Sequence, residues 1–219
     1  TAIDVDAKFN FFNPKFGFTY SLNNNNSIYA SFARANKEPN RNDFESNATD
    51  LTNEELNDFE LGWRHEGESL RLNANIYYMQ YNNQLVLTGA LDDVGEYLRE
   101  NVDESYRLGI ELDATLFLNN QFSLNSNLAA SRNKIKNLKI DRDGSLQDLG
   151  DTNIAFSPDL ITTHALEYVP NSKFRAALIG KYVGEQYMSN TDTEASKLDS
   201  YFVTDINFSY SLPLSLIHI

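Results

Sequence analysis

Apolar and polar positions alternate along the chain, most clearly over residues 106–118. In this stretch the even-numbered positions are apolar or aromatic, and the odd-numbered positions are mostly charged, polar or glycine. Successive side chains of a strand point to opposite faces, so the pattern predicts a strand with one apolar and one polar face. The stretch is much longer than the usual strand of about 5–6 residues and is long enough to cross a bilayer at a tilt.

Similar alternation recurs along the chain and predicts nine antiparallel strands. The least regular is 160–168, whose two faces are both mixed, and the apolar stretch 85–87 is expected to extend the fourth strand. Connections of about 3–4 residues alternate with connections of about 12–25, as in outer-membrane barrels, which have short turns at one end and long loops at the other. We therefore predict an all-β fold, an antiparallel transmembrane β-barrel fragment, with strands at 16–22, 28–35, 58–66, 70–81, 106–118, 122–132, 160–168, 174–182 and 201–212.

Aromatic residues fall at both ends of these strands, whereas Leu, Ile and Ala occupy most of the middle of the apolar rows. Two aromatic belts around an aliphatic band are typical of a barrel wall that meets two membrane interfaces. A general preference of aromatic residues for strands explains their number but not their placement. The predicted interface residues are Phe59, Trp63, Tyr78, Tyr106, Phe122, Phe174, Tyr182, Phe202 and Tyr210.

Nine strands leave two open edges, which a lipid bilayer does not tolerate. We therefore expect residues 1–212 to be part of a larger barrel that further strands complete. Residues 213–219 lack an aromatic terminus, so we interpret them as an atypical tail that need not be native to the barrel.

Charge and composition exclude several classes of protein. The 219-residue chain has a formal net charge of −13, which argues against a nucleic-acid partner. It contains no cysteine, so disulfides, thiol chemistry and cysteine-bound metals are excluded. It also lacks a run of about 18 apolar residues, so no transmembrane helix is predicted.

The polar rows show little that resembles an active site. His65, His164 and His218 lie on different predicted elements and form no metal-binding pair. Residues 141–144 resemble a calcium loop but lack the EF-hand glutamate, so we interpret them as a turn. Carboxylates on these rows could form a glycosidase pair, but polar side chains are the usual lining of a wide barrel. We therefore predict no enzyme activity, no metal site and no cofactor, and interpret Asp58, Glu60, Glu111 and Asp113 as lining, with Arg64, Arg71, Arg107 and Lys181 to balance their charge.

Several short sequence segments (called phrases below) together resemble a known protein family. The late phrases GKYVGEQY (180–187) and YFVTD (201–205) resemble the late barrel of receptors from the Bacteroidota group. The earlier phrases resemble the barrel of TonB-dependent outer-membrane receptors; they are NPKFGFTY (13–20), IYASFAR (28–34), EPNR (38–41), FELGWR (59–64) and LGIEL (108–112).

This resemblance implies a barrel of about 22 strands around an N-terminal plug, of which this chain would cover about the last third without the plug. It implies an outer-membrane location in a Gram-negative bacterium, contact with outer-membrane lipid, and energy supplied through the TonB–ExbB–ExbD complex. The ligands it implies are iron chelates, cobalamin or oligosaccharides, and we take an iron–siderophore or similar chelate as the leading expectation.

The long loops would then hold the ligand-binding residues. Guanidinium and aromatic groups suit chelates and sugars, so the candidates are Arg41, Phe44, Tyr97 and Tyr187, with loop ordering as their alternative role. Two other function classes stay open on the sequence alone. One is a passive porin or barrel adhesin, and the other is a soluble, carbohydrate-binding β-sandwich.

Overall fold

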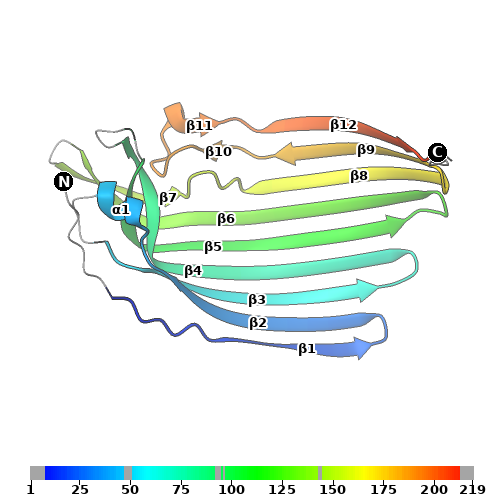
Figure 1. Cartoon of the computed structure of the whole chain (residues 1–219), viewed down its shortest axis with the longest axis horizontal. Helices are drawn as coiled ribbons and strands as arrows, with labels where there is room; N and C mark the ends of the chain where they lie inside the picture. Colours follow the sequence, from blue (N-terminus) through cyan, green and yellow to red (C-terminus); the bar gives the residue numbers. More distant parts are fainter. Residues whose placement is uncertain (1–7, 47–50, 92–94, 96, 143–144, 213–219) are drawn as a thin grey trace, which may run out of the picture.

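One antiparallel sheet forms almost all of the structure. The computed structural model describes residues 8–46, 51–91, 95, 97–142 and 145–212, and Figure 1 shows its strands side by side in a single layer. The sheet order is β1-β2-β3-β4-β5-β6-β8-β9-β12, and β7 pairs with β6 outside this path. This order and the antiparallel pairing confirm the predicted fold class.

The strands of the sheet are β1 (Lys15–Asn23), β2 (Asn26–Lys37), β3 (Glu54–Glu66), β4 (Leu70–Leu91), β5 (Tyr97–Phe117), β6 (Phe122–Arg142), β7 (Ser145–Asn153), β8 (Leu160–Asn171), β9 (Phe174–Val183) and β12 (Tyr201–Tyr210). The smaller elements are the helix α1 (Arg41–Ser46), the 3₁₀ turn η1 (Glu194–Ser196) and a two-stranded ribbon of β10 (Gln186–Tyr187) and β11 (Lys197–Leu198). No helix among the described residues is long and apolar enough to cross a membrane.

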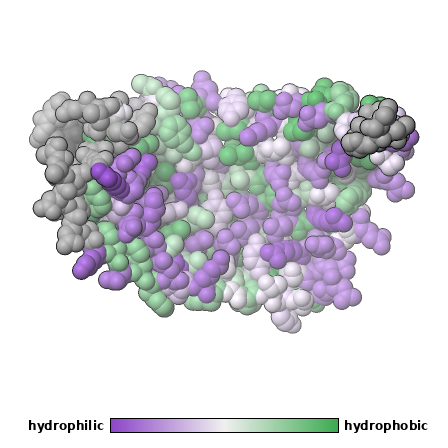
Figure 2. Space-filling model, in the orientation of Figure 1, coloured by the Kyte–Doolittle hydropathy of each residue, from purple (hydrophilic) through white to green (hydrophobic). Residues whose placement is uncertain are grey.

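The two faces of the sheet differ as the alternation predicted. Ile110 of β5 lies opposite Ile76 of β4, and both belong to one apolar face. The next residue, Glu111, lies opposite Asn75 on the polar face. Ile76 and Ile110 are 50% and 46% exposed, so no second layer of the described chain covers the apolar face. A β-sandwich would bury this face, so the sandwich alternative is wrong for this fold. Figure 2 shows hydrophilic and hydrophobic residues interspersed over the visible side of the molecule.

The irregular pattern of β8 has a local explanation. His164 lies on the apolar face, where Ser126 Oγ is 2.9 Å from its Nδ1 and Thr162 Oγ1 is 2.9 Å from its Nε2. The Thr162 hydroxyl donates its own proton to the carbonyl oxygen of Asn127, so it accepts from Nε2–H, and Ser126 donates to Nδ1. The polar groups on this face are therefore satisfied by one another.

Strands β4, β5 and β6 extend well beyond their predicted ends, and the predicted loops also contain the strands β7, β10 and β11. The stretch 85–87 does extend β4, but residues 82–91 and 97–104 pair as parts of β4 and β5, where a loop was predicted. Residues 133–142 continue β6 and pair with β7, where a loop was predicted. The predicted turn at 141–144 falls only partly within the description, because residues 143–144 lie outside the described residues, as does the tail 213–219.

The buried apolar core lies in these strand extensions and not under the sheet. Ile135 is fully buried among the other members of the cluster, and Ile140 packs against it. Within the described residues this is the hydrophobic cluster that the fold encloses; its members are Val86, Val102, Ile135, Leu138 and Ile154.

Candidate ligand-binding site

The long connections gather at one end of the sheet. We call this end the loop lobe, meaning the described residues within 38–53, 83–104, 133–159 and 184–200. In Figure 1 it lies at the left, opposite the short turns. Apart from the small cluster around Ile135, hydrogen bonds between distant segments hold it together, as the following contacts show.

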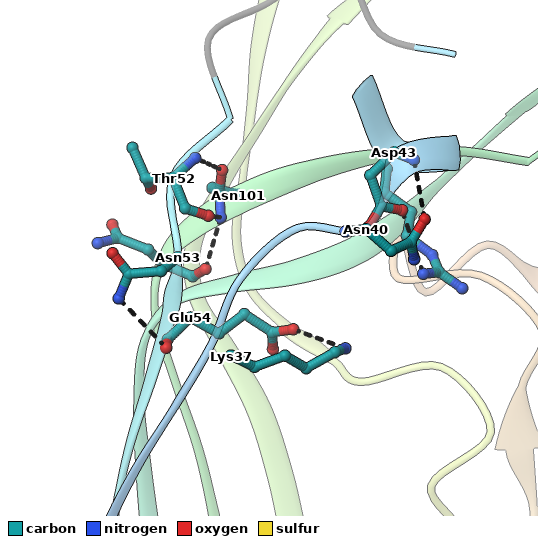
Figure 3. Close-up of polar contacts among 9 residues, drawn as sticks. Lys37, Asn40, Asp43, Thr52, Asn53, Glu54 and Asn101 are labelled. Carbon is teal, nitrogen blue, oxygen red and sulfur yellow. Dashed lines mark hydrogen bonds and ion pairs between the residues drawn. The ribbon is translucent and has the colours of Figure 1, made fainter. Parts of the chain in front are cut away.

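The helix α1 begins with a reciprocal cap. The backbone N–H of Asn40 donates to Asp43 Oδ2 at 2.8 Å, and the N–H of Asp43 donates to Asn40 Oδ1 at 3.1 Å, as Figure 3 shows. This exchange satisfies two donors at the helix start, where no intrahelical partner is available. Nearby, Asn101 of β5 exchanges hydrogen bonds of 2.9 Å and 3.0 Å with the backbone of Thr52, so the chain that follows α1 is fixed to the hairpin.

Two segments reach the same point of the β4–β5 hairpin. Asp43 of α1 is 6% exposed and forms an ion pair of 3.3 Å with Arg99 of β5. Leu87, which is opposite Arg99 in the register, accepts a hydrogen bond of 2.7 Å at its carbonyl oxygen from Asn190. The connections after β2 and after β9 therefore meet at one pair of residues.

Asn190 and Asp192 fasten the connection after β9 to the connection before β8. Asn190 is 4% exposed and also accepts a hydrogen bond of 2.8 Å from the N–H of Ala155. Asp192 accepts from the backbone and side chain of Asn153 at 2.9–3.0 Å. These hydrogen bonds and the Asp43–Arg99 ion pair join the long connections of the loop lobe to one another.

The structure places the four candidate ligand-binding residues in this lobe. Arg41 is exposed at the start of α1, and Phe44 of the same helix is half-buried. Tyr97 is the first residue of β5, two positions before Arg99, but its side chain lies outside the described part of the structure. Tyr187 is half-buried in β10, three positions before Asn190. Contact of these residues with a ligand stays a prediction.

Two further residues were not singled out from the sequence as ligand contacts: Phe156 belongs to the lobe, and Arg107 lies in β5 just outside it. Phe156 has a φ of 54°, and its side chain is 56% exposed. A non-glycine residue in this left-handed conformation costs roughly 1–2 kcal/mol. Arg107, assigned only to charge balance from the sequence, donates from one guanidinium nitrogen to Asn133 at 3.2 Å and to Ser157, the neighbour of Phe156, at 2.9 Å.

The polar face below the lobe carries the predicted lining carboxylates. Glu111 and Asp113 line a hollow of about 280 Å³ together with Asn73, Asn127 and Thr163, and Asp113 accepts a hydrogen bond from the Asn127 amide. Among the described residues no three His, Asp or Glu side chains gather as a metal site would require. Leu112, Leu128, Ala129 and Ile161 also line the hollow, so its lining is mixed polar and apolar.

The predicted interface aromatics fall into two rows on the apolar face. Towards the loop lobe, the Phe32 and Phe59 rings are 4.9 Å apart, and the Tyr78 and Tyr106 rings are 6.3 Å apart. Phe202 is opposite Tyr182 in the register. Rings that the prediction omitted also belong here, such as Phe16, which is 5.2 Å from Phe32.

Towards the short turns, the Phe122 and Tyr168 rings are stacked at 4.6 Å, and Tyr168 meets Phe174 edge-on at 6.4 Å. Tyr210 is opposite Phe174 in the register, and the Trp63 indole N–H donates to Asn26 at 3.2 Å. The role of both rows as membrane interfaces stays a prediction.

Burial gives the loop lobe a pH-sensitive carboxylate. Glu100 lies opposite Val86 in the hairpin, beside the apolar cluster, and burial raises the pKa of its carboxyl. The folded-state pKa is then above the unfolded-state pKa, so protonation favours the folded lobe. The resulting penalty is absent below the unfolded-state pKa, grows as the pH rises through the interval between the two, and is complete above the folded-state pKa.

Glu100→Gln is therefore expected to raise the stability of the loop lobe at neutral pH and to flatten its dependence on pH. Hydrogen exchange of residues 98–104 at a series of pH values from about 4 to about 8, corrected for intrinsic exchange, measures both effects. Asp103→Asn, at an exposed position of the same strand, is the control and should leave the profile unchanged. Equal profiles for wild type and Glu100→Gln would contradict the assignment.

Comparison with known proteins agrees with this geometry. The solved structure of the siderophore receptor PiuA from Acinetobacter baumannii superposes with a TM-score of 0.71 at 22% identity, over 90% of this chain and 29% of that chain. The copper transporter OprC gives a TM-score of 0.71 at 18% identity, over 90% and 31%. The ferric yersiniabactin uptake receptor FyuA from Yersinia pestis gives 0.68 at 16% identity, over 90% and 29%.

The chain therefore spans about 30% of the length of these proteins, and at such identities the likeness shows the fold alone. A search of curated protein sequences finds no match. The sequence model of the family described as TonB dependent receptor-like, beta-barrel, matches residues 2–216. The chain belongs to this family of TonB-dependent receptor β-barrels.

Proposed function

We propose that the chain is part of a receptor that imports an iron chelate across the outer membrane of a Gram-negative bacterium, with energy supplied through TonB. The observation that carries the proposal is the uncovered apolar face of the sheet, with a polar face behind it and a structured loop lobe at one end. The family consists of transport receptors and not of enzymes.

The apolar face supports a membrane location. Its uncovered side chains run from one aromatic row to the other, and in water such a large exposed apolar surface would drive association. In a bilayer the same surface faces acyl chains, and the aromatic rows lie at the two interfaces. Outer-membrane lipid is therefore the proposed partner of this face, and the loop lobe would lie outside the cell.

The loop lobe supports ligand capture. It brings α1 and the connection that contains Asn190 to the β4–β5 hairpin, which supports a binding surface built from several connections. The proposed contacts are Arg41, Phe44, Tyr97 and Tyr187. The plug domain of the same protein and the TonB–ExbB–ExbD complex are the proposed partners for transport, and residues 1–212 are the proposed barrel portion.

The relatives named above support a metal chelate as ligand without fixing the metal. Two of them are named for siderophore or ferric chelate uptake and one for copper. Iron is the proposed metal, and copper is the outcome that the test below distinguishes from it.

A deletion strain tests the proposal. Loss of the gene that encodes the whole receptor is expected to abolish uptake of a radiolabelled ferric chelate under iron limitation, and a TonB-deficient strain should show the same loss. Uptake that persists without TonB would indicate a passive porin. Loss of copper uptake alone would show that the ligand is a copper chelate and not an iron chelate.

Alanine at the four proposed contact positions in the full receptor should weaken chelate binding, and unchanged affinity would remove these residues from the site.

A further inference from the structure

Three basic residues occupy successive positions on the apolar face of β6, at its end towards the loop lobe. Arg132 is opposite Leu108 in the register, and Lys134 is opposite Tyr106. Lys136 follows two positions later, and side chains two positions apart in a strand point to the same face. We call Arg132, Lys134 and Lys136 the basic strip. It begins where the aliphatic row of β6 on this face ends.

Part of the positive charge of the basic strip is not neutralised by the fold. Lys136 forms an ion pair of 2.8 Å with Glu104, and Asp151 also lies near it. Arg132 and Lys134, in contrast, form no ion pair with a carboxylate among the described residues. Arg132 is exposed and Lys134 is half-buried. Two cations without a counter-charge therefore lie side by side on one face of a chain whose formal net charge is −13.

The basic strip lies at the aromatic row next to the loop lobe. The Tyr78 and Tyr106 rings of this row are 6.3 Å apart, and Lys136 Nζ lies 5.8 Å from the centre of the Tyr106 ring. Aromatic residues of a barrel wall lie at the level of the lipid headgroups. Because the strip belongs to the apolar face, its cations point away from the polar face and towards the proposed lipid. They are therefore at the depth where a lipid carries its phosphate.

We propose that the basic strip binds the phosphate of an anionic lipid in the leaflet next to the loop lobe. The Arg132 guanidinium donates to two phosphate oxygens, and the Lys134 ammonium adds a second positive charge. The acyl chains of the same lipid then lie along the aliphatic rows of β5 and β6. The inference rests on the proposed function, because it takes the apolar face to contact the membrane, and it adds the headgroup chemistry of the lipid bound there.

The test uses the full-length receptor, purified in detergent, and two lipid probes with the same acyl chains. Dimyristoyl phosphatidic acid carries an anionic phosphate monoester, and dimyristoyl phosphatidylcholine has a zwitterionic headgroup. Native mass spectrometry at a series of lipid concentrations gives the apparent Kd of each probe. Each basic residue near a membrane surface is worth about fivefold in affinity for anionic lipid, so the wild type should bind the phosphatidic acid at least about tenfold more tightly.

Three double variants assign the preference to the basic strip. Arg132→Gln with Lys134→Gln should weaken binding of the phosphatidic acid about tenfold or more and leave binding of the phosphatidylcholine unchanged. Arg132→Lys with Lys134→Arg keeps both charges and should keep both Kd values. Arg71→Gln with Lys181→Gln is the matched control, since it removes the same charge from the polar face, and it should also keep both Kd values.

The inference is overturned if the wild type binds the two lipids equally, or if the variant with glutamine at positions 132 and 134 keeps the wild-type Kd for the phosphatidic acid. Displacement of the phosphatidic acid by millimolar inorganic phosphate would show a site for free phosphate and would also overturn it. Should the glutamine variant fail to fold, the comparison of the two lipids on the wild type decides the matter. Uptake in the deletion strain judges the proposed function separately.

Discussion

Leu112→Arg is expected to lower the free energy of unfolding of the assembled receptor by about 2–4 kcal/mol, the cost of an arginine on the lipid face near the middle of a bilayer. Leu112 lies on the apolar face between Ala74 of β4 and Leu128 of β6, about midway between the two aromatic rows. A denaturant titration of the full receptor in lipid vesicles, followed by tryptophan fluorescence, measures the change.

The neighbouring position provides a control of the same size and charge. Glu111→Arg places the same side chain one residue away, on the polar face opposite Asn75, where a charge stays among polar groups. Its effect should be small beside that of Leu112→Arg. Equal losses for the two variants would contradict the assignment of the faces, because only the apolar face is proposed to contact lipid.

Ile135→Ala is expected to destabilise the loop lobe by about 2–5 kcal/mol, the usual cost of truncating a buried aliphatic side chain. Ile135 is fully buried in the cluster of Val86, Val102, Leu138 and Ile154. Hydrogen exchange of the receptor in lipid nanodiscs should show faster exchange in residues 98–104 and 133–140, with little change in β1 to β3.

Leu146→Ala is the control for this prediction. Leu146 belongs to β7 of the same lobe, but its side chain is 69% exposed, so its truncation leaves no cavity. Faster exchange that spreads through the whole sheet after Ile135→Ala would contradict the view that the lobe has a core of its own.

The sheet could be predicted from the sequence because each of its faces has one environment. A strand such as β5 alternates with a period of two wherever one face is apolar and the other polar, so residues 106–117 and their register neighbours were predicted correctly. The extensions beyond the aromatic rows do not meet that condition. β7 is mostly polar, and its two leucines, Leu146 and Leu149, are three positions apart, so they do not follow a period of two. Its pairing with β6 also includes register shifts near Leu138 and Gly150, so alternation does not reveal it.

The candidate site was predicted only in outline. Arg41, Phe44, Tyr97 and Tyr187 were chosen by residue type within long connections, and the structure places them in one lobe. Phe156 was missed because its left-handed backbone is set by contacts with Tyr187 and Asn190, which are distant in sequence. The link between Asn190 and Leu87 spans 103 residues, a separation at which a single sequence carries no signal.

The network around Asn190 has a consequence for the affinity of the proposed ligand. Connections that are held together by bonds such as those of Asn190 to Leu87 and Ala155 lose little conformational entropy on binding, so more of the contact energy would appear as affinity.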